Sequence, residues 1–157
     1  KKGDFIPTLT WDEVREMRDA GMEFGAHSFN SHDYAETGRP GQRRPLLAGP
    51  VFIPHWGRVE TDSEFRQRVK TDFAQARDVF RQELGYDPEI FAFPFGWAGP
   101  VACELAQEAG FKYIFTIEPG RVTAGTPPSE LPRINAGAGG LSAEELLVKL
   151  KQYGCAS

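Results

Sequence analysis

Apolar side chains recur at intervals of three and four positions in the longest periodic stretch of this sequence. Six of them follow one another in this way between Thr61 and Gly85, as on one face of an α-helix. Thr61 is followed three positions later by Glu64, the spacing of a capping box, and Gly85 is a typical residue after a helix C-terminus. The pattern predicts a long amphipathic helix over residues 61–84.

Three shorter helices are predicted from similar signals. Thr10 and Ser142 are each followed three positions later by a glutamate, which again forms a capping box. Pro100 suits the first position of a helix, because its missing N–H would be unpaired there in any case. The predicted helices cover residues 11–20, 100–109 and 143–153.

Short apolar runs alternate with these helices. The runs at 22–26, 90–93, 112–117 and 131–134 have the length of strands, and the alternation predicts parallel βα units and an α/β fold. Four strands are too few to close an eight-stranded barrel. Residues 33–58 contain four prolines and four glycines and show no period, so we expect an irregular segment there.

Composition and charge narrow the class of protein. The 157 residues are 40% apolar and carry a net charge of −4, which suits a single domain over residues 1–157. A basic stripe is lacking, so we expect no nucleic-acid partner, and no run of about 18 apolar residues predicts a membrane-spanning helix. Cys103 and Cys155 lack a metal-binding spacing, and the sequence leaves open whether they pair.

Two of the three histidines lie five positions apart, directly after the run at 22–26. His27 and His32 would therefore stand at the C-terminal end of a strand, where α/β barrels carry their sites. Imidazole nitrogens bind zinc and related divalent metals, so the pair is a candidate metal site, the alternative being polar loop surface. Asp33 either orients one of the imidazoles from behind or caps the turn.

A second motif, Pro94-Phe95-Gly96, follows the run at 90–93. Together with the segment 25–32 it resembles the motifs of the polysaccharide deacetylases, the NodB-homology family also called carbohydrate esterase family 4. The resemblance is strongest to the branch that de-N-acetylates poly-β-1,6-N-acetyl-D-glucosamine in biofilms, and it extends from Leu9 to about Tyr153. It implies that the chain forms part of a distorted (β/α)7 barrel, the C-terminal portion of one deacetylase domain.

The resemblance also implies an activity and roles for residues. The chain would hydrolyse N-acetyl groups of an N-acetylglucosamine polysaccharide, outside the cell or at its surface. His27 and His32 would bind a divalent metal, with Zn²⁺ preferred and Co²⁺ or Ni²⁺ as alternatives, and the backbone N–H of Phe95 would face the oxyanion. Amide hydrolysis of this kind also needs a general base and an acid for the leaving amine.

The sequence departs from the family pattern at two points. The family's adjacent aspartates, which provide a metal ligand and the base, have no counterpart, and Ala92 replaces an arginine that orients the catalytic aspartate. Either the N-terminal strands that carry the aspartates lie outside this chain, which we expect, or the chain is a degenerate relative. In the second case it would be a non-catalytic carbohydrate-binding or cell-surface interaction domain. Most of the aspartates that the chain does contain, Asp72 among them, lie on predicted helix faces or at caps, where we expect solvated charges.

Two further residues and one loop are candidates for binding. Trp97 leaves the strand end at the site, where its ring would stack on a sugar or pack beneath a loop. Arg133 would pair with a site carboxylate or form a structural salt bridge. The apolar loop 45–56 has arginines on both sides, and it either folds back onto the domain or makes an exposed patch for peripheral contact with a membrane or cell surface.

Overall fold

Four chain segments lie side by side in parallel at the centre of the molecule. The computed structural model describes residues 8–97, 99–136 and 140–155. Strand β5 (Ile90–Ala92) pairs in parallel with strand β6 (Tyr113–Phe115). Ala26 forms a parallel bridge to β5, and Leu131 forms one to β6 on the other side. The four segments therefore stand in chain order, as the strands of an α/β barrel do.

Two of the predicted strands are shorter than expected. The runs at 22–26 and 131–134 each contribute one bridge residue, Ala26 and Leu131, to the pairing. Within the described part of the chain each has a neighbouring strand on one side only, so it makes half the ladder bonds of an interior strand. The predicted class, an α/β fold with parallel pairing, is confirmed.

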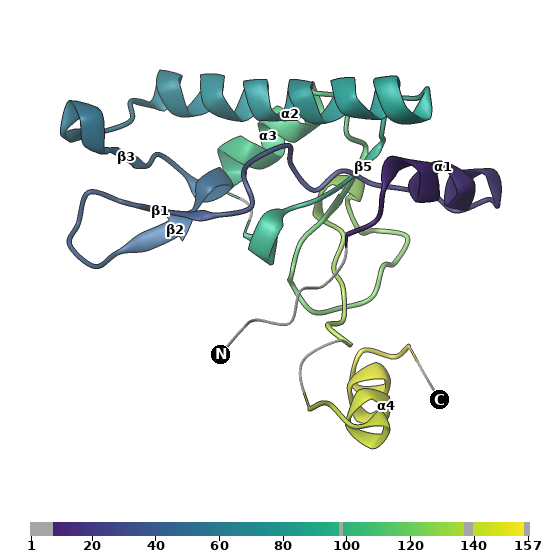
Figure 1. Cartoon of the computed structure of the whole chain (residues 1–157). Coiled ribbons are helices and arrows are strands. Elements are labelled where there is room, and N and C mark those ends of the chain that lie inside the picture. The colour runs from purple at the N-terminus through teal and green to yellow at the C-terminus, as the bar shows by residue number, and fades with distance from the viewer. Residues whose placement is uncertain (1–7, 98, 137–139, 156–157) are drawn as a thin grey trace, which may run out of the picture.

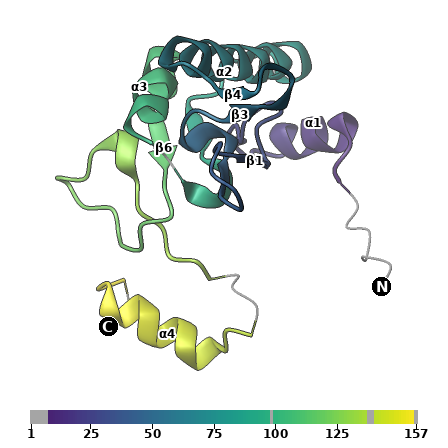
Figure 2. The ribbon, with the colours of Figure 1, turned by 90° about the vertical axis from the view of Figure 1, so that its left-hand side faces the viewer.

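The four predicted helices are present. Helices α1 (Trp11–Asp19), α2 (Asp62–Leu84) and α4 (Ala143–Gln152) begin at the three capping boxes, and α3 (Pro100–Glu108) begins at its proline. Helix α2 spans the top of the molecule and packs against α1 and α3, while α4 lies apart from the sheet (Figures 1 and 2). None of the helices in the described ranges has the length and apolar character needed to cross a membrane.

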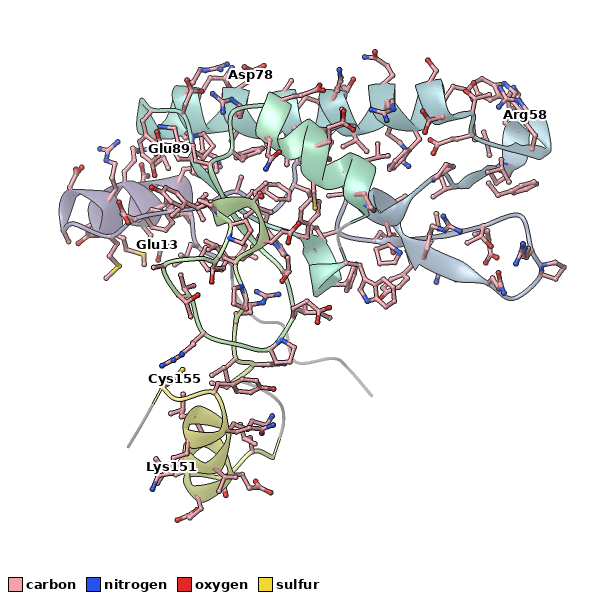
Figure 3. All side chains as sticks on the ribbon, turned by 180° about the vertical axis from the view of Figure 1, so that it is seen from behind. Glu13, Arg58, Asp78, Glu89, Lys151 and Cys155 are labelled. Carbon is pink, nitrogen blue, oxygen red and sulfur yellow. The ribbon has the colours of Figure 1, made fainter. Side chains whose placement is uncertain are left out.

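The hydrophobic core lies between α2, α3 and the parallel segments. Phe73 of α2 is fully buried and meets the rings of Phe91 and Phe111 edge-on, with centroids 5.0 and 5.7 Å apart. Such edge-to-face pairs add to the stabilisation from burial. The opposite face of α2 carries charged side chains such as Asp78, which point away from the core (Figure 3). The core thus fixes α2 over the sheet with one face inward.

The prediction of an irregular segment at 33–58 is wrong in part, because two small hairpins form there. Strand β1 (Tyr34–Glu36) pairs antiparallel with β2 (Arg43–Pro45), and β3 (Phe52–Ile53) pairs with β4 (Arg58–Val59). Strands of two or three residues are too short to show a period in the sequence. Most of the prolines and glycines lie in the turns between them, where they are compatible with the backbone.

The apolar loop 45–56 folds back onto the domain instead of forming an exposed patch. Leu47 and Val51 are 1% and 7% exposed, and Phe52 and Ile53 are half-buried. Burial of these side chains reduces the apolar surface on which membrane contact was predicted. Trp56, at 56% exposed, is the large apolar side chain that this loop presents to solvent.

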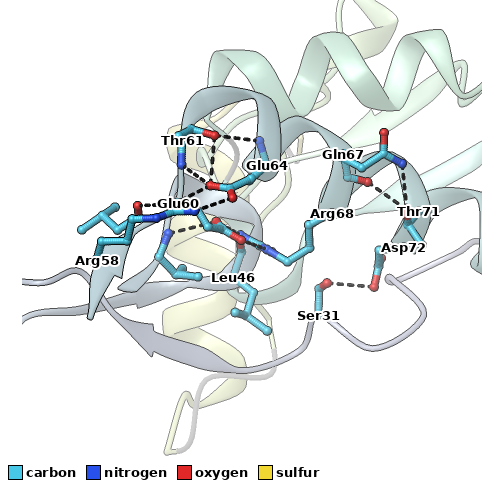
Figure 4. Close-up of polar contacts among 12 residues, drawn as sticks. Ser31, Leu46, Arg58, Glu60, Thr61, Glu64, Gln67, Arg68, Thr71 and Asp72 are labelled. Carbon is cyan, nitrogen blue, oxygen red and sulfur yellow. Dashed lines mark hydrogen bonds and ion pairs between the residues drawn. The ribbon is translucent and has the colours of Figure 1, made fainter. Parts of the chain in front are cut away.

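Ion pairs fasten this region to the start of α2 (Figure 4). Arg68 binds the carboxylate of Glu60 and donates a hydrogen bond to the carbonyl of Leu46 at 3.0 Å. Arg58 forms two hydrogen bonds of 2.7 Å with Glu64. These bonds, together with the N–H of Thr61, lower the pKa of Glu64 to about 2. The loop before α2 is therefore tied to the helix by two ion pairs and a hydrogen bond to Leu46, and not by apolar contact alone.

Candidate functional site

The sequence-predicted site residues gather at the C-terminal edge of the parallel segments. His27 directly follows Ala26, Phe95 follows β5, and Arg133 follows Leu131. Because the segments are parallel, the residues that follow them meet at the same edge. Residues that are up to 106 positions apart in the sequence thus come together by topology alone.

The two histidines face one another at this edge. Their ring centroids are 5.1 Å apart, and Nδ1 of His27 lies 2.7 Å from the carbonyl oxygen of Ala92. A hydrogen bond donated by Nδ1 leaves Nε2 free to bind a metal, the usual arrangement at metal sites. Burial lowers the pKa of His27, although the bond to Ala92 opposes this effect, and the charges of His32 and Arg133 lower the pKa further. The neutral imidazole that a metal requires is therefore favoured.

Residues 27–32, which we call the histidine loop, are held by a buried aspartate of α2. The Asp72 carboxylate accepts hydrogen bonds from the N–H groups of Phe29 and Asn30, at 3.1 and 2.8 Å. It also accepts one from the hydroxyl of Ser31 at 2.8 Å (Figure 4). Asp72 is only 6% exposed, so its interpretation as a solvated helix charge is wrong. The sequence indicates this burial, because Asp72 lies between Val69 and Phe73 on the apolar face of the helix.

The turn after β5 supports the histidines from the other side. The ring of Phe95 stacks on that of His32, with centroids 4.5 Å apart and planes inclined by 20°. Phe95 has φ 57°, and Ser28 in the histidine loop has φ 75°. These are the two described non-glycine residues with left-handed backbone, a strained conformation that often occurs at functional sites. Strained backbone therefore occurs both in the loop that carries His32 and in the turn whose ring stacks on it.

The other predicted site residues are placed as follows. The side chain of Asp33 accepts a hydrogen bond from the N–H of Tyr34 at 2.6 Å, a contact within its own turn. Trp97 is 61% exposed beside the first hairpin. Arg133 lines a cavity of about 550 Å³ together with Phe95, and no carboxylate of the described residues forms an ion pair with it.

The two imidazoles could supply part of the ligand set of a metal site. His27 and His32 supply two converging imidazoles, but the described residues contain no cluster of three histidine, cysteine, aspartate or glutamate side chains that could enclose a metal ion. Tetrahedral zinc sites with an open position use three protein ligands. The cysteines do not contribute, because Cys103 is half-buried in α3 and Cys155 is exposed, and both are free thiols. The described residues thus supply two of the three ligands that such a site would need.

Comparisons with known proteins agree with this geometry. A sequence model of the polysaccharide deacetylase family matches residues 3–114. The poly-beta-1,6-N-acetyl-D-glucosamine N-deacetylase of Escherichia coli strain K12 is 29% identical over 126 residues, which cover 80% of this chain and 19% of that protein. The chain therefore spans about a fifth of the length of this relative.

Solved structures are similar over the same share of the chain. The deacetylase domain of BpsB from Bordetella bronchiseptica is 28% identical with a TM-score of 0.76, over 80% of this chain and 48% of that one. A de-N-acetylase from Aggregatibacter actinomycetemcomitans is 26% identical with a TM-score of 0.74, over 80% and 47%. The chain belongs to the polysaccharide deacetylase family, as the matched residues, these deacetylase structures and the two histidines at the strand ends together indicate.

Proposed function

We propose that residues 1–157 form the part of a polysaccharide N-deacetylase that carries its two metal-binding histidines. The substrate proposed is an N-acetylglucosamine polymer, in particular poly-β-1,6-N-acetyl-D-glucosamine, the substrate in the name of the Escherichia coli relative. The observation that carries the proposal is the pairing of His27 and His32 at the C-terminal edge of the sheet, with Nδ1 of His27 bonded to Ala92. The deacetylase family is generally metal-dependent, which agrees with this arrangement.

We assign the following roles in the proposed reaction. A divalent metal, with Zn²⁺ preferred over Co²⁺ or Ni²⁺, would polarise the acetamide carbonyl and lower the pKa of water. His27 and His32 would hold it through their free nitrogens. The backbone N–H of Phe95 would donate to the oxyanion from the left-handed turn after β5. The third ligand, the base and the acid are assigned to groups outside the described residues.

Metal content tests the proposal first. The complete polypeptide that contains residues 1–157 should bind close to one zinc or cobalt ion, as read by elemental mass spectrometry, and release acetate from acetylated oligosaccharides. His27→Ala and His32→Ala should each lose the metal and the acetate release. His55→Ala is the matched control, because His55 lies in an exposed turn away from the site and should keep both. Full metal content in both site variants would overturn the proposal.

A place outside the cell or at its surface follows from the proposed substrate, because a biofilm polysaccharide lies there. Peripheral contact through loop 45–56 would depend on Trp56, since the other large apolar side chains of the loop are buried or half-buried. Fractionation of cells that produce the complete polypeptide tests the location. Recovery only with cytosolic markers would contradict it.

A further inference from the structure

A groove lies between the first hairpin and the turn after β5. Its walls include Tyr34 of β1, Arg43 and Arg44 of β2, and the ring of Trp97, and its volume is about 560 Å³. Two aromatic side chains, 36% and 61% exposed, thus face solvent in one depression beside polar groups. Ligand sites in proteins combine this kind of concave aromatic lining with a few polar groups. We call this depression the hairpin groove.

A row of aromatic ring contacts connects the histidine pair with the hairpin groove. The ring of His32 stacks on Phe95, and Phe95 in turn contacts Tyr34, with centroids 4.4 Å apart. Tyr34 lines the groove, so successive ring contacts lead from the proposed metal ligands into it without interruption. A polymer with one unit at the histidines would therefore place a neighbouring unit along this row of rings.

The charge of the groove is positive. Among the described residues that line it, Arg43 and Arg44 are charged and none is a carboxylate. Arg43 is partly neutralised by Glu36, whose carboxylate lies 3.8 Å away, and it also donates to the carbonyl of Tyr34. Arg44 has no carboxylate partner among the described residues and lies over Gly49, where a Cβ atom would come within 2.5 Å of its Nη1. The described lining residues therefore leave the groove with a net positive charge.

We propose that the hairpin groove binds the sugar unit next to the one being deacetylated, and that its arginines select a neighbour that still carries its acetyl group. This inference rests on the proposed function. Trp97 and Tyr34 offer apolar faces on which a sugar ring stacks. An acetamido group is neutral, whereas the amine left by deacetylation is protonated at slightly acidic pH and is repelled by Arg44. The groove would therefore discriminate between product and substrate units.

Binding and kinetics with matched variants test the groove. The complete polypeptide is titrated calorimetrically, at slightly acidic pH, with a β-1,6-linked tetramer of N-acetylglucosamine and with the same tetramer carrying one free amine. Trp97→Ala should weaken binding of the acetylated tetramer about five- to tenfold. Trp56→Ala, which removes a similarly exposed tryptophan that does not line the groove, should not change it.

The effect of the groove's positive charge is tested by calorimetry with the same two tetramers. Arg44→Gln should improve binding of the amine-bearing tetramer relative to the acetylated one by about three- to fivefold, the effect of removing one charge at short range in water. Arg39→Gln, in the turn of the same hairpin but outside the groove lining, should leave the ratio unchanged. An unchanged ratio in Arg44→Gln, or equal effects of both substitutions, would overturn the selection.

Failure of the groove and failure of the proposed function give different results. If acetate is released from the tetramer at the same rate by Trp97→Ala and by the unchanged protein, and calorimetry shows equal affinity, the groove is refuted while the deacetylase remains. If no acetylated oligosaccharide is hydrolysed but Trp97→Ala still weakens binding, the groove stands as a sugar site and the proposed reaction is wrong. Circular dichroism of each variant confirms folding.

Discussion

Replacement of Asp72 with alanine removes the acceptor that holds the histidine loop. The carboxylate takes hydrogen bonds from two backbone N–H groups and from the hydroxyl of Ser31, with lengths of 2.8 to 3.1 Å. Without it these three donors lose their partner. The strained backbone of Ser28, with φ 75°, directly precedes the residues that these bonds hold.

The expected loss of stability follows from the burial of these donors. A buried donor without an acceptor costs about 1–3 kcal/mol, and the Ser31 hydroxyl belongs to this class. The N–H groups of Phe29 and Asn30 are on exposed residues, so water recovers part of their loss. We therefore expect Asp72→Ala to lower the free energy of unfolding by about 2–4 kcal/mol. Asp72→Asn, which keeps one acceptor oxygen, should lower it by about 1–2 kcal/mol.

Urea denaturation measures this change, and two local measurements identify its origin. Amide hydrogen exchange of Phe29 and Asn30 should speed up in Asp72→Asn, and the affinity for zinc should fall about 10- to 100-fold, as when the partner of a metal ligand is lost. Asp78→Asn on the outer face of α2 is the control and should change stability by less than about 0.5 kcal/mol. Unchanged exchange and zinc affinity in a folded Asp72→Asn protein would refute the reasoning.

Two further changes test the turn after β5 and the loop before α2. Gly96→Ala should lower the free energy of unfolding by about 2–4 kcal/mol in urea, because its φ is 69° and the added Cβ would lie 1.3 Å from Ile117. Gly21→Ala, which has open space at φ 93°, should cost only about 1 kcal/mol, and equal losses would contradict the packing argument. The pKa of Glu64, held at about 2 mainly by Arg58, means that its stabilising effect is complete above the unfolded value of 4.5 and is lost as the pH falls through about 2. The stability difference of Glu64→Gln should shrink over this range, and an NMR titration placing the Glu64 carboxyl near 4.5 would contradict it.

The helices follow from the sequence because their signals are local. Each capping box is four residues long, and the side chains of Thr10, Thr61 and Ser142 accept the N–H groups that their spacing predicts. The apolar period of α2 is read within one segment and matches its buried face. The hairpins of residues 33–58 are different, because their strands depend on pairing between residues and not on a pattern within either strand.

The site follows from the sequence only in part. His27 and His32 are recognisable from type, spacing and their place after an apolar run. The role of Asp72 depends on contacts with residues 41 to 43 positions away, which no local pattern encodes. The left-handed turn at Phe95 is equally hidden, since phenylalanine gives no local signal for positive φ and the conformation is imposed by its surroundings.

The hydrogen bond between His27 and Ala92 joins residues 65 positions apart. Ala92 also donates its own N–H to the carbonyl of Ala26, so the acceptor for the imidazole is set by the register of the parallel pairing. A slip of one residue would present a different carbonyl and leave the tautomer of His27 unspecified. A peptide of residues 23–33 alone would contain both imidazoles without this acceptor, and it would bind metal weakly. Tight metal binding that appears during refolding would therefore indicate that the distant strands have paired in the correct register.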